Sequence, residues 1–285
     1  MANEQVLANY NVIAAYLAGT VLPFARGATV LRNLISVKPP DPGAKSATFY
    51  KETTVSTASI VGEGSQASKS QLVDTPVTPT TQKMMVYWEP TIEALRYARG
   101  HGDPERLKAD AGKALGQKFD LDGLALASGF SQSVGTTNTT LTEAKLDEAI
   151  YIVGLSDTIE DIVGILHPKQ ARDIRTSIIG TTATFFTGGA NQSVAQHTRA
   201  DLRGYLGKYL DTDLFQSKNT PSLNSNVDWG GLVLTRNAIC CVEDEDVEVM
   251  EAVDPEYGKH KISLSQFVGF AELKDAEGCL VVSKK

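Results

Sequence analysis

The sequence predicts an α+β fold, and three observations lead to this prediction. A polar segment with strand-like composition at both ends covers residues 45–86. Apolar residues recur at every fourth position after residue 103, which predicts a long helix. Strand and helix patterns alternate between residues 140 and 180, and strand patterns dominate after residue 210. Helices and strands that are partly segregated along the chain in this way are expected to form α+β layers.

Composition and charge exclude several classes of protein. The 285 residues are 42% hydrophobic and 21% charged, which is ordinary for a globular chain with a large core. The net charge is −7 and the basic residues are scattered, so sequence-specific nucleic-acid binding is not expected. The three cysteines form neither a disulfide framework nor a zinc motif, which favours a reducing compartment. The apolar run 12–18 lacks a basic leader and is too short for a membrane span, so we expect a cytosolic, soluble chain.

The N-terminal third predicts an arm followed by a β-ribbon. Residues 1–44 begin weakly helical and become extended at the proline-rich stretch 38–43. The first ribbon strand is expected at 48–57, and the second, at 80–88, is expected to pair with it. Residues 62–81 have the Gly, Ser, Thr and Pro content of a hairpin tip, and Pro90 ends the ribbon. A two-stranded ribbon is marginal alone, so we expect it to lie on another copy of the chain.

The most regular helix is expected at 103–126. Asp103 is a good N-cap and Pro104 suits the first turn. Gly112 and Gly116 imply a close backbone approach or a bend. The predicted apolar face consists of Leu107, Ala111, Leu115 and Phe119, continuing through Leu121, Leu124 and Leu126.

An α/β alternation follows a polar linker at 131–139. A capping box from Thr140 to Glu143 predicts a second helix that ends at Gly154, and 161–166 reads as a buried strand. A third helix is expected to begin at His167 and Pro168. The inward residues are expected to be Leu146, Ala149, Ile150 and Val153 in the second helix and Ala171, Ile174 and Ile178 in the third.

The remaining chain predicts a polar loop, one helix and several strands. The loop covers 180–193, and the spacing of apolar residues over 202–210 is helical. Strands are expected at 214–217, 231–236 and 247–250. A last β-hairpin is expected from 261–273 and 278–282, with its turn at 274–278.

Few residues suggest chemistry, and we expect no catalytic, cofactor-binding or metal-binding site. The acidic run 243–246 could bind calcium, but it lacks the spacing of a calcium loop and reads better as a solvated turn. Solvation of helix ends also accounts for the acidic pairs at 120 and 122 and at 211 and 213. His167 follows a predicted strand, where active-site residues often lie, and it also begins a predicted helix, where it would have a structural role. The structural role is favoured. Cys240 and Cys241 are expected to be buried thiols.

The element order and three segments carry a resemblance to a known family. Residues 103–126, with Ala111, Ala114, Leu115, Asp120 and Leu124, look like that family's spine helix. Residues 162–178 are similar to its strand, proline and helix unit, and 206–217 with Pro221 looks like a recurring segment of its members. The chain resembles the major capsid proteins of tailed bacteriophages, which have the Hong Kong 97-like fold. The match covers nearly the whole chain.

The resemblance implies a division into an N-terminal arm (1–44), an extended β-ribbon loop (45–92), a peripheral domain with the spine helix (93–138 and 255–285) and an inserted α/β axial domain (139–254). It implies self-assembly as hexamers and pentamers into an icosahedral shell around packaged double-stranded DNA. Further implied partners are a separate scaffolding protein, a portal and a decoration protein, with no cofactor and no membrane. The implied location is the virion capsid, assembled in the bacterial host cytoplasm. The ribbon-tip residues expected to contact a neighbouring subunit are Glu63, Ser65, Gln66, Lys69 and Gln71.

Two departures from the family pattern concern processing. Some members join a lysine on the extended loop to an asparagine on the terminal strands. Lys69 lies near the ribbon tip here, but the last turn holds Asp275 and Glu277 and no asparagine, so no such cross-link is expected. The arm is also too short to include a long fused scaffolding segment.

Two alternative functions stay open at this point. An encapsulin-like nanocompartment resembles the same fold at a similar length, and encloses cargo enzymes in place of DNA. A small-molecule enzyme that uses the His167 region is an alternative of a different class.

Overall fold

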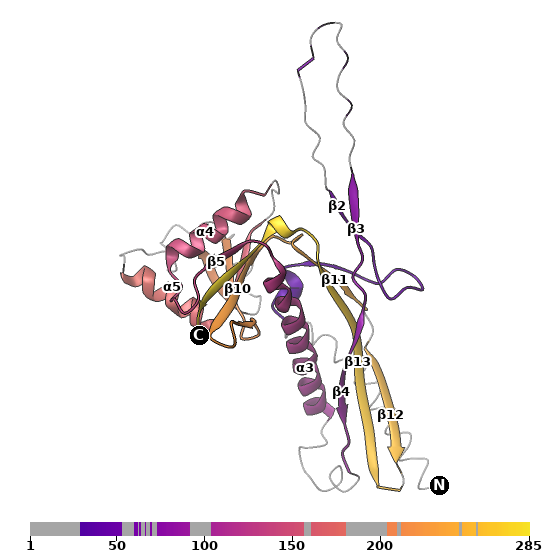
Figure 1. Cartoon of the computed structure of the whole chain (residues 1–285). Coiled ribbons are helices and arrows are strands. Elements are labelled where there is room, and N and C mark those ends of the chain that lie inside the picture. The colour runs from indigo at the N-terminus through magenta and orange to yellow at the C-terminus, as the bar shows by residue number, and fades with distance from the viewer. Residues whose placement is uncertain are drawn as a thin grey trace, which may run out of the picture.

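The computed structural model describes residues 29–52, 60–61, 63, 66, 69, 73–91, 104–156, 161–180, 204–209, 212–244, 247–254 and 256–285. Two β-sheets and a long helix form the body, and a narrow two-stranded ribbon extends from one end of it (Figure 1). The predicted α+β class is confirmed: the described elements are three α-helices, short 3₁₀ turns and fourteen strands.

The first sheet is organised around β13 (Lys259–Glu272). It pairs antiparallel with β4 (Gln82–Trp88), β11 (Ile239–Glu243) and β12 (Glu248–Asp254), and β11 pairs in parallel with β1 (Ser36–Lys38). Alternate residues of a strand face opposite sides of a sheet. Ile262, Leu264 and Val268 are therefore buried together on the side that the long helix covers.

The second sheet is organised around β10 (Asp228–Leu234). It pairs antiparallel with β6 (Val163–Leu166), β9 (Ser222–Leu223) and β14 (Gly278–Lys284). Outside these, β5 (Ser133–Gly135) pairs with β14, β8 (Thr212–Gln216) with β6, and β7 (Tyr205–Tyr209) with β8. The helices α4 (Glu143–Gly154) and α5 (Pro168–Gly180) share one apolar cluster with this sheet. All four residues of β6 are buried, as expected of a strand without a polar face.

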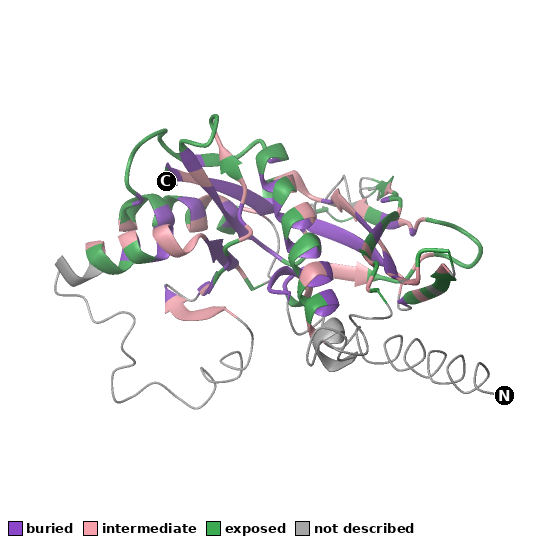
Figure 2. Ribbon diagram, turned by 90° about the horizontal axis from the view of Figure 1, so that it is seen from below, coloured by how far each residue is buried: buried purple, intermediate pink, exposed green. Residues whose placement is uncertain are grey.

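The long helix α3 (Pro104–Ala125) begins at the predicted proline and continues into the 3₁₀ turn η2 (Leu126–Gly129). Ala111, Leu115 and Phe119 are buried, and Figure 2 shows buried, intermediate and exposed residues on different sides of this helix. The Phe119 ring meets the Phe270 ring of β13 edge to face, with 4.8 Å between the centroids. The prediction that Leu121 belongs to this face is wrong, because Leu121 is 47% exposed. It lies about 200° around the helix axis from Phe119.

The ribbon pairs differently from the prediction. Strand β2 (Phe49–Glu52) pairs with β3 (Asp74–Val77), so that Phe49 is opposite Val77. The predicted second strand exists as β4 and ends before Pro90, but it pairs with β13 and belongs to the first sheet. The apolar residues Met84 and Val86 explain the difference, because they pack on the core cluster under α3, which a free ribbon does not provide.

Three further predictions from the second half of the chain are wrong. β13 and β14 do not form a hairpin: the 3₁₀ turn η4 (Asp275–Glu277) carries the chain from the first sheet to the second. Residues 205–209 form a strand where a helix was predicted, and Gly204 and Gly207 have φ values of 81° and 140°, outside helical backbone. No capping box begins α4. Thr142 precedes the helix without a side-chain cap, and the Glu143 carboxylate accepts a hydrogen bond from the Tyr209 hydroxyl instead.

The linker predicted at 131–139 contains the strand β5, which pairs with residues 280–282 of β14. The loop predicted at 180–193 lies outside the described residues apart from Gly180, the last residue of α5. Strands β11 and β12 lie in the first sheet, although the expected axial range 139–254 includes them, and β14 lies in the second sheet. The residue ranges of the domains remain predictions.

Candidate assembly interface

The base of the ribbon is fixed to the first sheet by a small apolar cluster. Ala47 and Phe49 are buried against Cys240, Val242 and Leu273. The Lys38 ammonium lies over the Phe49 ring, 4.6 Å from its centroid. The predicted burial of Cys240 and Cys241 is confirmed.

The returning strand of the ribbon crosses β13 at a glycine. Thr81 N donates a hydrogen bond to Lys45 O at 2.8 Å, and Ser46 forms a β-bridge with Thr80. A Cβ atom on Gly269 would overlap the Thr80 carbonyl, so only glycine fits at this crossing. The two ends of the ribbon are therefore held together where they leave the body.

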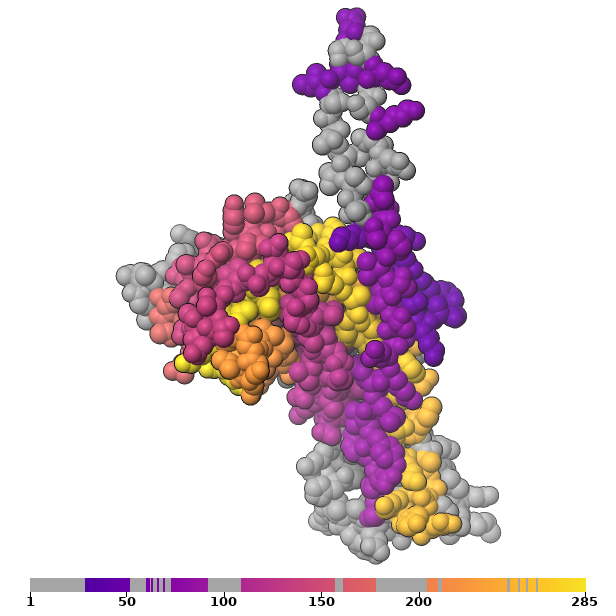
Figure 3. All heavy atoms as spheres, viewed as in Figure 1, coloured from indigo at the N-terminus to yellow at the C-terminus, as the bar shows by residue number. Residues whose placement is uncertain are grey.

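Beyond its base, the ribbon presents apolar side chains that nothing in the described subunit covers. Tyr50, Ile60, Val61 and Val73 are exposed, and Ile60 is exposed completely. Figure 3 shows the described residues at the far end of the ribbon standing well away from the body. Of the predicted tip residues, Glu63, Gln66 and Lys69 are exposed, whereas Ser65 and Gln71 lie outside the described residues. Exposed aliphatic groups on a two-stranded ribbon are typical of a surface that a partner covers.

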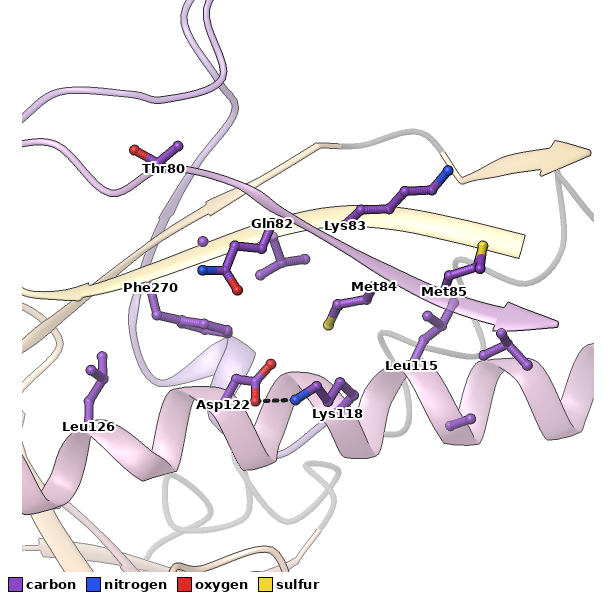
Figure 4. Close-up of a pocket in the computed structure, with 14 residues that line it drawn as sticks. Thr80, Gln82, Lys83, Met84, Met85, Leu115, Lys118, Asp122, Leu126 and Phe270 are labelled. Atoms are coloured by element: carbon purple, nitrogen blue, oxygen red, sulfur yellow. Dashed lines mark hydrogen bonds and ion pairs between the residues drawn. The ribbon is translucent and has the colours of Figure 1, made fainter. Parts of the chain in front are cut away.

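A groove of about 560 Å³ runs between α3 and the strands β4 and β13. Its floor is apolar, with Met84, Leu115 and Phe270, and the ion pair between Lys118 Nζ and Asp122 Oδ1 (2.6 Å) lies at its rim (Figure 4). Five consecutive residues of β4, from Gln82 to Val86, line the groove. Consecutive residues alternate between the two faces of a strand, so the groove follows the edge of β4. Among the described strands, β4 pairs only with β13.

The segment 29–35, called the strap below, lies where α3 and both sheets meet. It contains the 3₁₀ turn η1 (Leu31–Asn33), and Leu31 and Ile35 are buried in the main core cluster. Val30 N lies 3.1 Å from each carboxylate oxygen of Asp120, and Leu31 N donates to Asp120 Oδ1 at 3.2 Å. Asp120 is only 1% exposed, so the prediction that it solvates a helix end is wrong. Its carboxylate binds backbone amides of a segment about 90 residues away.

A second buried carboxylate holds the strap to the first sheet. Arg32 Nε donates to Glu243 Oε2 at 2.6 Å, and Gln266 Nε2 donates to Glu243 Oε1 at 2.9 Å. Glu243 is 3% exposed and ends the buried strand β11. The predicted solvated turn is therefore wrong for Glu243. Within the described residues, no group of three or more His, Cys, Asp and Glu side chains could hold a metal ion.

His167 has the contacts of a structural residue. Its ring stacks on the Trp229 ring with 3.8 Å between centroids, and its Nδ1 accepts a hydrogen bond from Lys169 N at 3.1 Å. Burial, Lys285 and Lys169 lower its pKa, which favours the neutral imidazole. The stacked ring and the first-turn hydrogen bond account for the position of His167 at the start of α5.

No helix in the described ranges is long and apolar enough to cross a membrane. No protein-family model matches the sequence, and no curated protein matches it either.

Solved structures do match, and they cover nearly the whole chain. The capsid of Ralstonia phage GP4 is 11% identical over 88% of this chain and 87% of that chain, with a TM-score of 0.67. The capsid of cyanophage P-SCSP1u is 17% identical over 91% and 89%, with a TM-score of 0.64. The SrpI encapsulin of Synechococcus elongatus PCC 7942 is 13% identical over 88% and 85%, with a TM-score of 0.61. At such identities the likeness shows a shared fold, and the Hong Kong 97-like fold expected from the sequence is confirmed.

Proposed function

We propose that this chain, whose fold is that of phage capsid proteins, is the major capsid protein of a tailed bacteriophage. Many copies assemble as hexamers and pentamers into an icosahedral shell around packaged double-stranded DNA. The observation that carries the proposal is the shared fold over about nine-tenths of the chain together with a ribbon whose apolar residues have no cover within the described subunit. The role is structural rather than enzymatic.

The ribbon of one subunit lies on its neighbour, and the groove beside β4 is the surface that receives it. Tyr50, Ile60 and Val73 are the apolar groups that need cover, and the groove offers the partly exposed Val86, Leu126 and Phe270. The edge of β4 that no described strand occupies can pair with an extended segment through backbone hydrogen bonds. Glu63, Ser65, Gln66, Lys69 and Gln71 then contact the neighbouring subunit at the ribbon tip.

The domains of the proposed capsid protein follow the sheets more closely than the ranges expected from the sequence. The first sheet and α3 form the peripheral domain, with residues 239–254 included. The second sheet, α4 and α5 form the axial domain, with β14 included. The arm and the extended loop keep their ranges of 1–44 and 45–92, except that β1 and β4 belong to the first sheet.

Partners beyond the chain itself follow from the same proposal. A separate scaffolding protein, a portal and a decoration protein assemble with the shell in the host cytoplasm. The net charge of −7 favours weak, non-specific contact with the packaged DNA. The last turn carries no asparagine and Glu277 is ion-paired with Lys274, so subunits run as monomers on a denaturing gel.

Electron microscopy of the purified chain tests the proposal. Closed shells are expected from the wild type. A variant in which a two-residue turn replaces residues 60–72 keeps the pairing of β2 with β3, and it is expected to fold but to form no closed shells. A wild type that elutes from gel filtration as a monomer or small oligomer would favour the enzyme alternative.

The encapsulin-like alternative rests on the matching SrpI structure. Shells purified from the native source distinguish the two functions by their contents. Double-stranded DNA inside the particles supports the capsid proposal, whereas an enclosed protein cargo supports a nanocompartment.

A further inference from the structure

The strap lies where the two sheets, α3 and the turn that joins β10 to β11 meet. Asp120 of α3 binds the amides of Val30 and Leu31, and Arg32 binds Glu243 of the first sheet. Ser36, just beyond the strap, donates its amide to Arg236 O and its hydroxyl to Asn237 Oδ1, both in the turn that joins β10 to β11. The strap region is thus bonded to a connection between the sheets as well as to α3.

Shape complementarity adds to these polar contacts. A Cβ atom on Gly123 of α3 would overlap Leu31 Cδ2. The Leu31 side chain therefore fits against α3 only because residue 123 is glycine. On the other side, a Cβ on Gly204, next to β7 of the second sheet, would lie 3.4 Å from Val30 Cγ2. Val30 therefore reaches the second sheet while its neighbours Leu31 and Arg32 contact α3 and the first sheet.

Open volume lies beside this junction. A cavity of about 430 Å³ is lined by Val30 and Asp120 on one side and by Pro168 of α5, Gly204 before β7 and Gln216 of β8 on the other. The two sheets are not packed tightly against each other at this place. Elsewhere residues of both sheets share the main core cluster, so the strap adds to that packing at the place where the cavity lies.

We propose that the strap sets the orientation of the second sheet relative to the first, with Asp120 and Arg32 as positioning residues. Asp120 holds the backbone of the strap against α3, and Arg32 holds it against β11. The Val30 side chain then contacts the second sheet at Gly204 and limits its position. Weakening either carboxylate contact frees the second sheet to change its angle while each sheet stays intact. The inference concerns one subunit and holds whether or not the chain forms a capsid.

Distances between spin labels test the proposal in the unassembled subunit. The three native cysteines are buried, so new surface cysteines can be labelled selectively. One pair, Tyr151→Cys on α4 and Met85→Cys on β4, spans the two sheets, and both positions are exposed. A second pair, Met85→Cys and Tyr257→Cys, lies within the first sheet and its end turn.

Asp120→Asn is introduced into both labelled backgrounds, with Asp122→Asn as the matched control. Asp122 is on the same helix, but its partner is the exposed Lys118. With Asp120→Asn, the distance distribution of the pair that spans the sheets is expected to broaden or shift, and that of the pair within the sheet to stay unchanged. Asp122→Asn is expected to change neither distribution.

Two results overturn the proposal. One is an unchanged distribution between the sheets in folded Asp120→Asn. The other is equal broadening of both pairs, which means general loosening. If Asp120→Asn does not fold, Val30→Ala is measured in its place, because it removes the contact toward Gly204 without affecting the buried carboxylate.

Discussion

Arg32 and Glu243 form an ion pair of 2.6 Å, although about 210 residues separate them in the chain and Glu243 is almost fully buried. A buried carboxylate that loses its partner costs about 3–5 kcal/mol, more than the pair itself contributes. Arg32→Met is therefore expected to lower the free energy of unfolding by about 3 kcal/mol. Urea unfolding of the unassembled subunit measures this change.

The double variant Arg32→Met with Glu243→Gln provides the control for that prediction. It removes the Glu243 charge, which has no cationic partner in the single variant Arg32→Met. Its loss of stability is therefore expected to be smaller than the sum of the two single losses. Additive losses would show that the two side chains do not interact.

Gly269→Ala is expected to destabilise the subunit by about 1–3 kcal/mol, because the new methyl group overlaps the Thr80 carbonyl, which is held by the pairing at the ribbon base. Urea unfolding gives the total loss, and hydrogen exchange is expected to rise at residues 45–46 and 80–81. Gly154→Ala is the matched control. The nearest atom to its Cβ is Ile162 Cδ1 at 3.8 Å, so this variant is expected to be neutral or slightly more stable. Equal losses for both glycines would contradict the close crossing.

Ile60→Ser tests whether the ribbon's apolar side chains contribute to assembly. Ile60 has no cover in the described subunit, so its replacement leaves subunit stability unchanged. Burial of an aliphatic side chain is worth about 1.5–3 kcal/mol, so the subunit concentration needed for assembly is expected to rise at least about tenfold. Light scattering during assembly measures that concentration. Leu121→Ser, on the exposed side of α3, is expected to leave it unchanged, and an unchanged value for Ile60→Ser would argue against the ribbon contact.

The thiols provide a prediction about pH. Burial raises the pKa of Cys240 and of Cys279 to about 11, and it raises that of Cys241 further. The reactive thiolate is a very small fraction well below the pKa, so nearly all of each of the three groups is protonated at pH 8. We expect native protein at pH 8 to react with a thiol reagent far more slowly than protein unfolded in urea, in which all three thiols react. A fast-reacting thiol in the native subunit would contradict the burial.

Local sequence patterns predicted the three described α-helices because those signals come from neighbouring residues. The signals are Pro104, the four-residue spacing of Ala111, Leu115 and Phe119, and Pro168, and each acts within one or two helical turns. The pairing partners of strands were harder to predict, because β-propensity indicates that a segment is a strand but not which strand it pairs with. Residues 80–88 were correctly expected to be extended, but their partner β13 lies far along the chain.

The buried carboxylates could not be found by local reasoning. Nothing near Asp120 distinguishes it from the exposed Asp122, because its partners are backbone amides of residues 30 and 31. The strand at 205–209 did carry a signal: Gly204 and Gly207 weaken a helix, and both adopt positive φ. The apolar spacing outweighed that signal in the prediction.

The pairing of β4 with β13 also determines when the subunit can finish folding. Trp88 pairs with Ile262, and at usual translation rates the roughly 170 residues between them take on the order of 10–30 s to synthesise. During that time β4 has left the ribosome without its only described partner, and its edge is open to pairing with other nascent chains. Strands β11 and β12 have the same partner, so the first sheet closes only near the end of synthesis. Newly made chains therefore pass through an aggregation-prone interval, during which a chaperone that covers exposed strand edges would increase the yield of folded subunits.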